Sequence, residues 1–151
     1  PDGGVLAAAA TDALHLFDTE TWEARTFPTP RGLLAGPPIP VLDVLFGPEG
    51  GYAFTAGATG RAWNTETGEP IGSLEPPPTI RDVALAPGRR VLAVAGNQLS
   101  LWELPSGRNC RTLPAHEGGP TAVAFCPDGK TLATAGRKKH DLTLWEVNIR
   151  P

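Results

Sequence analysis

Short apolar runs alternate with polar turns rich in glycine and proline along the whole chain, and the alternation repeats. Four times a proline-led turn is followed by an apolar run of small residues and then by an aromatic residue with a polar neighbour. The turns begin at Pro1, Pro48, Pro87 and Pro127, so successive turns are 47, 39 and 40 residues apart. Apolar runs of this length, bounded by turn residues, predict short β-strands. A strand repeat of about 40 residues predicts the blades of a β-propeller.

The last repeat shows the pattern most fully. It predicts an inner strand at 121–126, a tight turn at 127–130, a second strand at 131–136 and a third strand at 142–147. Aligned with it, the other repeats predict inner strands at 41–46 and 80–86, second strands at 5–10, 52–57 and 91–96, third strands at 14–18, 60–64 and 99–104, and polar fourth strands at 24–27, 70–74 and 109–113.

The second strands do not alternate apolar with polar residues, as the run VLAVAG at 91–96 illustrates. Such runs are expected where neighbouring sheets cover both faces of a strand. The sequence therefore predicts an all-β fold, a β-propeller of four-stranded antiparallel blades with about four blades present. The repeats span approximately 1–40, 41–79, 80–119 and 120–151 of a single propeller segment.

The first predicted blade lacks its inner strand and the last lacks its outer strand, which leaves fourteen strands. Propeller rings hold roughly 4–8 blades. We therefore expect an arc of a larger ring, over closure of this segment on itself or pairing with another copy. The unpaired strand edges at its two ends predict a tendency to self-associate.

Composition narrows the classes of partner. The 13 Lys and Arg residues are outnumbered by 16 acids, which disfavours general binding to nucleic acid because such binding depends on neutralising phosphates. No uncharged run approaches the ~20 apolar residues that a membrane-spanning helix needs. Two cysteines cannot define a disulfide framework, so we expect free thiols and a cytoplasmic protein, with no nucleic-acid or membrane partner.

The segment from His116 to Glu146 carries a family resemblance. His116, the run AVAFCPDGKTLATAG and the closing LTLWE resemble the Gly-His start, the inner-strand-and-turn signature and the Trp-Asp end of the WD-repeat family. The resemblance is strongest in the fourth repeat, weaker in the second and third, and weakest in the first. It implies a β-propeller that binds other proteins.

In that family a His, a Ser or Thr, a Trp and an Asp form a buried hydrogen-bond network within each blade. Carried over position by position, the resemblance implies a structural network at His116, Thr134 and Trp145 in the fourth repeat, and at Thr55 and Trp63 in the second. It also implies that the network is partial.

Two departures from the family pattern support a partial network. Asp141 stands closer to Trp145 than the pattern requires, and the position that should offer a hydroxyl to Trp102 is Val94. The Trp102 N–H must therefore bond elsewhere or reach water. On this basis we expect Trp145→Phe to cost more stability than Trp102→Phe.

The chain carries no recognisable catalytic constellation. Gly129-Lys130-Thr131 ends like a phosphate-binding loop, but a strand follows it where a helix is required. The three His and two Cys show no paired metal spacing, and no serine lies on a nucleophile elbow. The sequence therefore predicts no catalytic residue, no metal and no cofactor.

What remains is the loop-bearing surface. In the family's geometry, the loops before the inner strands and those between second and third strands share one rim, here called the top rim. The residues predicted to form a partner-binding site there are Asp43, Arg81, Asp82, Arg137, Lys138, Lys139 and His140. The cluster at 137–140 is basic, which favours an acidic or phosphorylated partner, although an ordinary solvated loop would have the same composition.

Two classes of function are compatible with these residues. The preferred hypothesis is a non-catalytic scaffold that recruits partner proteins, or other domains of the same polypeptide, through its loop rims. The alternative is a propeller enzyme or a small-molecule-binding propeller with a site in the central channel. The predicted inner strands offer that channel only Asp43, Arg81, Asp82 and Thr121 as polar groups.

Overall fold

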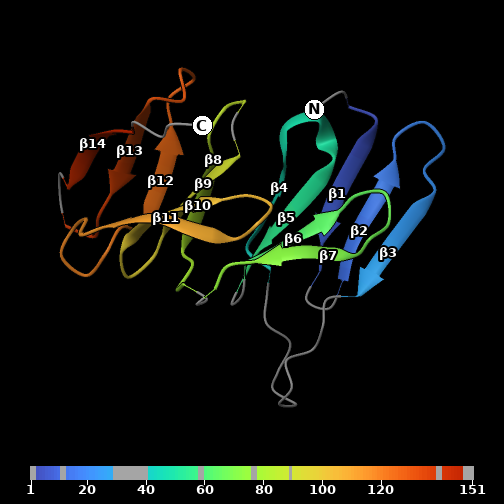
Figure 1. Ribbon diagram of the computed structural model, residues 1–151, viewed down its shortest axis with the longest axis horizontal. Helices are drawn as coiled ribbons and strands as arrows, with labels where there is room; N and C mark the ends of the chain where they lie inside the picture. The colour runs from blue at the N-terminus through green and yellow to red at the C-terminus, as the bar shows by residue number, and fades with distance from the viewer. Residues whose placement is uncertain are drawn as a thin grey trace, which may run out of the picture.

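The computed structural model describes residues 3–10, 13–28, 41–57, 60–75, 78–88, 90–138 and 141–147. Within these residues, fourteen strands form four antiparallel sheets that lie side by side in a row (Figure 1). The first and last sheets occupy opposite ends of the row (Figure 1). The all-β fold predicted from the sequence is confirmed.

The strands follow the chain in simple order. The first sheet contains β1 (Val5–Ala9), β2 (Ala13–Asp18) and β3 (Ala24–Pro28). The second contains β4 (Asp43–Phe46), β5 (Tyr52–Ala56), β6 (Arg61–Asn64) and β7 (Pro70–Ser73), with a 3-10 turn at Pro48–Gly50 between β4 and β5. The third contains β8 (Asp82–Leu85), β9 (Val91–Ala95), β10 (Leu99–Glu103) and β11 (Arg108–Leu113). The fourth contains β12 (Ala122–Phe125), β13 (Thr131–Ala135) and β14 (Leu142–Glu146).

Each strand lies where the apolar runs and turns predicted it. In the described residues the first sheet has no strand inside β1, and the fourth has none outside β14, as the sequence indicated. The tight turn after β12 is also present, because Gly129 donates its backbone N–H to the Cys126 carbonyl at 2.9 Å. Gly129 has a φ of +64°, which favours glycine at this position.

The cores lie between successive sheets. We call the face of a sheet that packs on the next sheet along the chain its front face, and the opposite face its back face. Front faces present aliphatic, alanine or phenylalanine side chains, and the back faces of the second, third and fourth sheets each include a tryptophan. The contacts are Leu14 and Leu16 on Ala53 and Trp63, then Phe54 and Ala62 on Val94 and Trp102, then Leu99 and Leu101 on Val123, Leu132 and Trp145.

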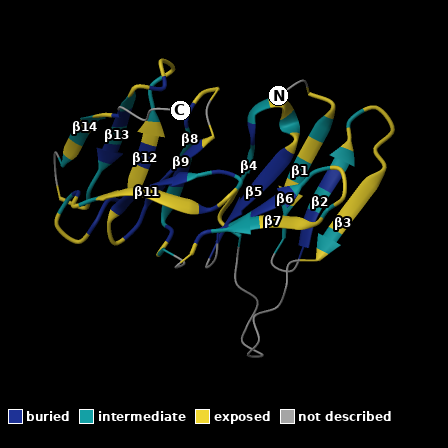
Figure 2. Ribbon diagram, in the orientation of Figure 1, coloured by how far each residue is buried: buried dark blue, intermediate teal, exposed yellow. Residues whose placement is uncertain are grey.

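The central sheets are consequently buried on both faces. Every residue of β5 and of β9 is buried, whereas β1, β12 and β14 at the ends of the row alternate between more and less exposed positions (Figure 2). Apolar burial on two faces is the main stabilising contribution expected for such stacked sheets. The outer strand β11 is largely exposed and polar, as an outermost strand should be.

Candidate functional site: the blade network and the top rim

A chain of hydrogen bonds crosses the fourth blade. Trp145 Nε1 donates to Thr134 Oγ1 at 2.8 Å, and Thr134 Oγ1 also lies 2.8 Å from His116 Nε2. His116 Nδ1 in turn lies 2.5 Å from Asp141 Oδ1. An indole can only donate and a carboxylate can only accept, so with a neutral imidazole the Thr134 hydroxyl donates to Nε2 and Nδ1–H donates to Asp141. All four side chains are therefore satisfied.

Asp141 reaches His116 because the loop between β13 and β14 folds back on itself. Gly136 N–H donates to the Asp141 carbonyl at 2.8 Å, and Asp141 N–H donates to the Lys138 carbonyl at 3.2 Å. The spacing between Asp141 and Trp145, which the sequence suggested was too short, is accommodated by this turn. The network of the fourth blade has all four members.

His116 occupies an uncommon backbone conformation. Its φ is +59°, in the left-handed region that costs a non-glycine residue conformational energy. Its side chain is only 1% exposed and has a partner at each ring nitrogen. Gly119, with a φ of +80°, closes the same turn by donating its N–H to the His116 carbonyl at 3.1 Å. The network thus helps to hold the turn that leads into β12.

The second and third blades each satisfy their tryptophan with a single hydroxyl. Trp63 Nε1 donates to Thr55 Oγ1 at 2.9 Å. Trp102 Nε1 donates to Ser100 Oγ at 2.7 Å, and both Trp102 and Ser100 are buried. Ser100 pairs in register with Val94. The hydroxyl is therefore supplied by the third strand of this blade, opposite the second-strand position at which the family pattern expects it. The prediction that Trp102 bonds elsewhere is met by this serine.

Because the Ser100 hydroxyl accepts the Trp102 N–H, there is no longer a reason to expect Trp145→Phe to cost more stability than Trp102→Phe. That expectation depended on the absence of a hydroxyl beside Trp102. Each indole in fact donates one hydrogen bond to a buried hydroxyl. The sequence signal was available, because a serine two residues before a tryptophan on one strand faces the same side of the sheet. We now expect similar costs for the two Trp→Phe substitutions.

At the top rim, two of the predicted partner-binding residues are engaged within the protein. Arg81 Nη1 donates to the Gly96, Gly118 and Pro120 carbonyls at 2.5, 3.0 and 3.3 Å. Because Gly118 and Pro120 belong to the loop before β12, Arg81 fastens the third blade to the fourth.

Asp82 makes a second link between the same blades. Its Oδ1 accepts the backbone N–H of Val83 at 3.0 Å, and its Oδ2 accepts that of Val123 at 2.8 Å. Val123 lies on the inner strand of the fourth blade. Arg81 and Asp82 therefore join adjacent blades, a role that spacing along the sequence gave no means of detecting.

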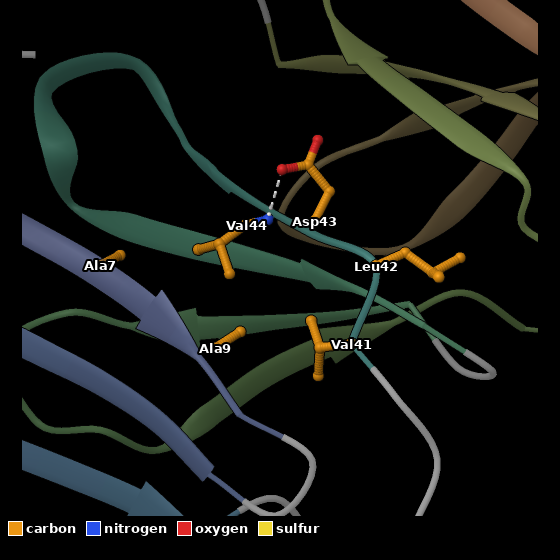
Figure 3. Close-up of a pocket in the computed structure, with 6 residues that line it drawn as sticks. All are labelled: Ala7, Ala9, Val41, Leu42, Asp43 and Val44. Atoms are coloured by element: carbon orange, nitrogen blue, oxygen red, sulfur yellow. Dashed lines mark hydrogen bonds between the residues drawn. The ribbon is translucent and has the colours of Figure 1, made fainter.

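Asp43 holds the equivalent place one blade earlier, but it is exposed. Asp43 pairs with Ala56 as Asp82 pairs with Ala95, and its Oδ1 accepts the Val44 N–H at 2.7 Å. It lines a shallow groove between β1 and β4 (Figure 3). The other lining residues are Ala7, Ala9, Val41, Leu42 and Val44. Asp43 is the one charged side chain of this groove, so the groove offers no constellation for acid–base chemistry.

The basic cluster is described only in part. Arg137 and Lys138 are exposed in the turn after β13, and Lys138 forms an ion pair with Glu117 in the loop before β12. Lys139 and His140 lie outside the described residues. The structure thus brings Arg137 and Lys138 to the same end of the fourth blade as His116, while Arg81 and Asp82 point into the contact between blades.

Among the residues that the structure describes, three ionisable side chains have shifted pKa values. The backbone N–H groups of Thr21 and Glu20 lower the pKa of Asp18, and those of Lys130 and Thr131 lower the pKa of Asp128. Burial raises the pKa of Tyr52. All three belong to turns or cores, not to the top rim.

In the described part of the chain, no group of three or more His, Cys, Asp and Glu residues is arranged to hold a metal ion. Cys110 and Cys126 are free thiols. None of the helices in those residues has the length and apolar character to cross a membrane.

Part of the chain matches a known protein family. Residues 107–145 match the WD40 family, described as WD domain, G-beta repeat. The chain is 34% identical over 83 residues to the serine-threonine kinase receptor-associated protein of Rattus norvegicus, covering 54% of this chain and 23% of that protein. It is 27% identical over 158 residues to the anaphase-promoting complex subunit cdc20 of Dictyostelium discoideum, covering 97% of this chain and 30% of that protein. The chain thus spans less than a third of these relatives.

Solved structures show the same fold. The computationally designed Ika4 protein matches 98% of this chain and 88% of its own, with a TM-score of 0.75 and 16% identity. A chain of the Mitotic Checkpoint Complex matches 97% of this chain and 46% of its own, with a TM-score of 0.74 and 21% identity. The row of sheets is therefore a partial β-propeller.

Proposed function

We propose that this chain, a WD40-repeat segment of a β-propeller, is a non-catalytic scaffold that recruits partner proteins through the loops of its top rim. The observation that supports this most is how the polar groups are distributed. Within blades, buried hydroxyls pair with the indoles of Trp63, Trp102 and Trp145 and with His116, and between blades Arg81 and Asp82 pair with backbone groups. The polar groups that remain for a ligand lie on exposed loops and on the outer strands β3 and β11.

The family supports the same conclusion. WD40 proteins are typically non-catalytic. The related proteins are named as a subunit of the anaphase-promoting complex, a cofactor of that complex and a receptor-associated protein. Membership in assemblies of this kind is the property that we extend to this chain. Its partners would be other proteins or other domains of the same polypeptide, in the cytoplasm.

The chemistry of the top rim suggests what such a partner carries. Arg137 and Lys138 are exposed at the end of the fourth blade, followed in sequence by Lys139 and His140. Exposed cations in one loop favour carboxylates or phosphates on the partner, and Arg binds either group with two hydrogen bonds. The ion pair of Lys138 with Glu117 joins two exposed side chains, so it can be exchanged at little cost. We therefore propose an acidic or phosphorylated peptide as the ligand of this rim.

A direct binding measurement tests the proposal. Fluorescence anisotropy would follow labelled peptides rich in Glu or phosphoserine as the full chain is added, at low and high salt. The triple substitution Arg137→Glu, Lys138→Glu and Lys139→Glu should abolish binding. A control, Arg108→Glu with Arg111→Glu, reverses two positive charges on the exposed outer strand β11 and should leave binding intact. Equal loss in both variants, or no binding by the unaltered chain, would show that the loop is an ordinary solvated surface.

The competing function, a ligand site in the central channel, has less support. The groove lined by Asp43 is the feature that favours it (Figure 3). A cationic small molecule that raises the melting temperature of the chain, and no longer does so after Asp43→Asn, would favour this function over the scaffold.

A further inference from the structure

Two loops at the top of the fourth blade are tied to each other. The loop before β12 contains His116 and Glu117, and the loop between β13 and β14 contains Lys138 and Asp141. His116 Nδ1 bonds to the Asp141 carboxylate at 2.5 Å, and Asp141 N–H donates to the Lys138 carbonyl at 3.2 Å. These bonds hold the two loops side by side, and Glu117 on one loop forms an ion pair with Lys138 on the other.

The backbone around Glu117 is held on both sides. His116, directly before it, is buried and has a partner at each ring nitrogen. The carbonyl of Gly118, directly after it, accepts a hydrogen bond from Arg81 Nη1 at 3.0 Å. An exposed ion pair loses much of its energy to the ordering of two long side chains, and a fixed backbone lowers that cost for the glutamate.

The paired side chains nevertheless remain open to solvent. The Lys138 side chain is 65% exposed and that of Glu117 is 79% exposed. Arg137, the residue before Lys138, is also exposed and forms no ion pair within the described part of the chain. An anionic group that approaches this loop therefore meets two cations, one of which already holds a carboxylate. It can contact both cations only if Glu117 leaves Lys138.

We propose that Glu117 is an internal competitor for the anionic ligand of the top rim, an inference that rests on the proposed function. Its carboxylate occupies Lys138 in the free protein and is displaced when a carboxylate or phosphate of the partner binds there. Because Glu117 and Lys138 belong to one folded chain, dilution of the protein does not weaken this competition. Glu117 therefore lowers the affinity of every anionic ligand that uses Lys138.

Glu117→Gln tests the proposal, because it removes the charge and nearly preserves the size of the side chain. The probe is a labelled phosphoserine peptide, since one phosphate has enough acceptor oxygens to contact both cations. In fluorescence anisotropy at low salt, Glu117→Gln should bind the peptide about two- to fivefold more tightly, the range expected for release from an exposed ion pair. The gain should shrink at high salt, because salt screens exposed charges.

Glu103→Gln is the matched control. Glu103 forms an exposed ion pair with Arg108 at 3.0 Å, in the turn between β10 and β11, on the rim opposite the two loops. The same change of charge there should leave the affinity for the peptide unaltered. Circular dichroism of each variant would establish that the fold is retained.

A second substitution separates competition from simple repulsion between Glu117 and the ligand. If Glu117 acts by occupying Lys138, Glu117→Gln brings no gain once Lys138→Gln is also present. Repulsion would give the same gain in both backgrounds, and that result would overturn the proposal. In the unaltered chain, the carboxyl carbon resonance of Glu117 should move toward its position in the Lys138→Gln variant as the peptide saturates the protein. A resonance that does not respond to bound peptide would equally refute displacement.

The same measurements distinguish failure of this inference from failure of the proposed function. Binding by the unaltered chain that Glu117→Gln leaves unchanged would overturn the role of Glu117 alone. Absence of binding in both the unaltered chain and the Glu117→Gln variant would overturn the role of Glu117 and the binding of anionic peptides together.

Discussion

Thr134→Val is the substitution that most directly probes the blade network, because it removes one atom on which two other side chains depend. Valine has nearly the shape of threonine, so packing in this 1%-exposed site is retained while Oγ1 is lost. His116 Nε2 and Trp145 Nε1 then both lack their partner. The His116 side chain, at 1% exposure, cannot reach water instead.

The expected magnitude follows from the number of groups left unpaired. Each buried polar group without a partner costs about 1–3 kcal/mol. Two such groups predict that Thr134→Val lowers the free energy of unfolding by roughly 2–4 kcal/mol, with the half-buried Trp145 contributing less than His116. Thr55→Val leaves one indole unpaired, that of Trp63, and should cost about 1–3 kcal/mol.

Urea unfolding followed by circular dichroism measures these differences, since the midpoint and slope give the free energy by linear extrapolation. Thr143→Val is the control: Thr143 pairs with Thr134 across the same sheet, and among the described residues its hydroxyl has no hydrogen-bond partner. The double variant Thr134→Val with Trp145→Phe should lose less than the sum of the single losses, because both disrupt one bond. A Thr134→Val cost no larger than that of Thr143→Val or Thr55→Val would refute the reasoning.

Two other predictions follow from turns and cores. Asp18→Asn should flatten the pH dependence of unfolding: the N–H groups of Thr21 and Glu20 lower the pKa of Asp18, so its contribution is present above the ordinary carboxyl pKa and is lost as pH falls through the lowered value. Stability at neutral pH should change little, because in the next blade an asparagine, Asn64, accepts two backbone N–H groups of the equivalent turn at 2.8 and 2.9 Å. Urea midpoints measured from neutral to acidic pH test this prediction. Tyr52→Phe should leave stability unchanged or raise it, because the buried Tyr52 hydroxyl has no hydrogen-bond partner in the described structure; a lower urea midpoint would contradict this.

The strands could be predicted from the sequence because two local signals agree at each of them. Turn residues such as Pro127 and Gly129 fix where the chain reverses, and apolar runs between them require burial on both faces. Neither signal depends on contacts distant in the sequence. The order of the strands then follows from the repeat, since each strand pairs with its neighbour along the chain.

The candidate site was harder to predict, since side-chain partners are chosen in three dimensions. Arg81 and Asp82 have the composition of a binding rim, yet their acceptors and donors lie in the loop and strand of the next blade. Ser100 supplies a hydroxyl from a position where the family pattern does not place one. The sequence contains the residues in each case, but a pattern that repeats every blade cannot show how consecutive blades are tied together.

The constant direction of the packing, front on back at every contact, makes the architecture modular. A blade inserted between two others would meet a tryptophan-bearing back face on one side and an apolar front face on the other. Length can therefore change by whole repeats with little change in the apolar contacts, provided that the Arg81 and Asp82 links between the third and fourth blades are kept. Duplication of a single blade, between the second and third, should consequently yield a chain that still folds.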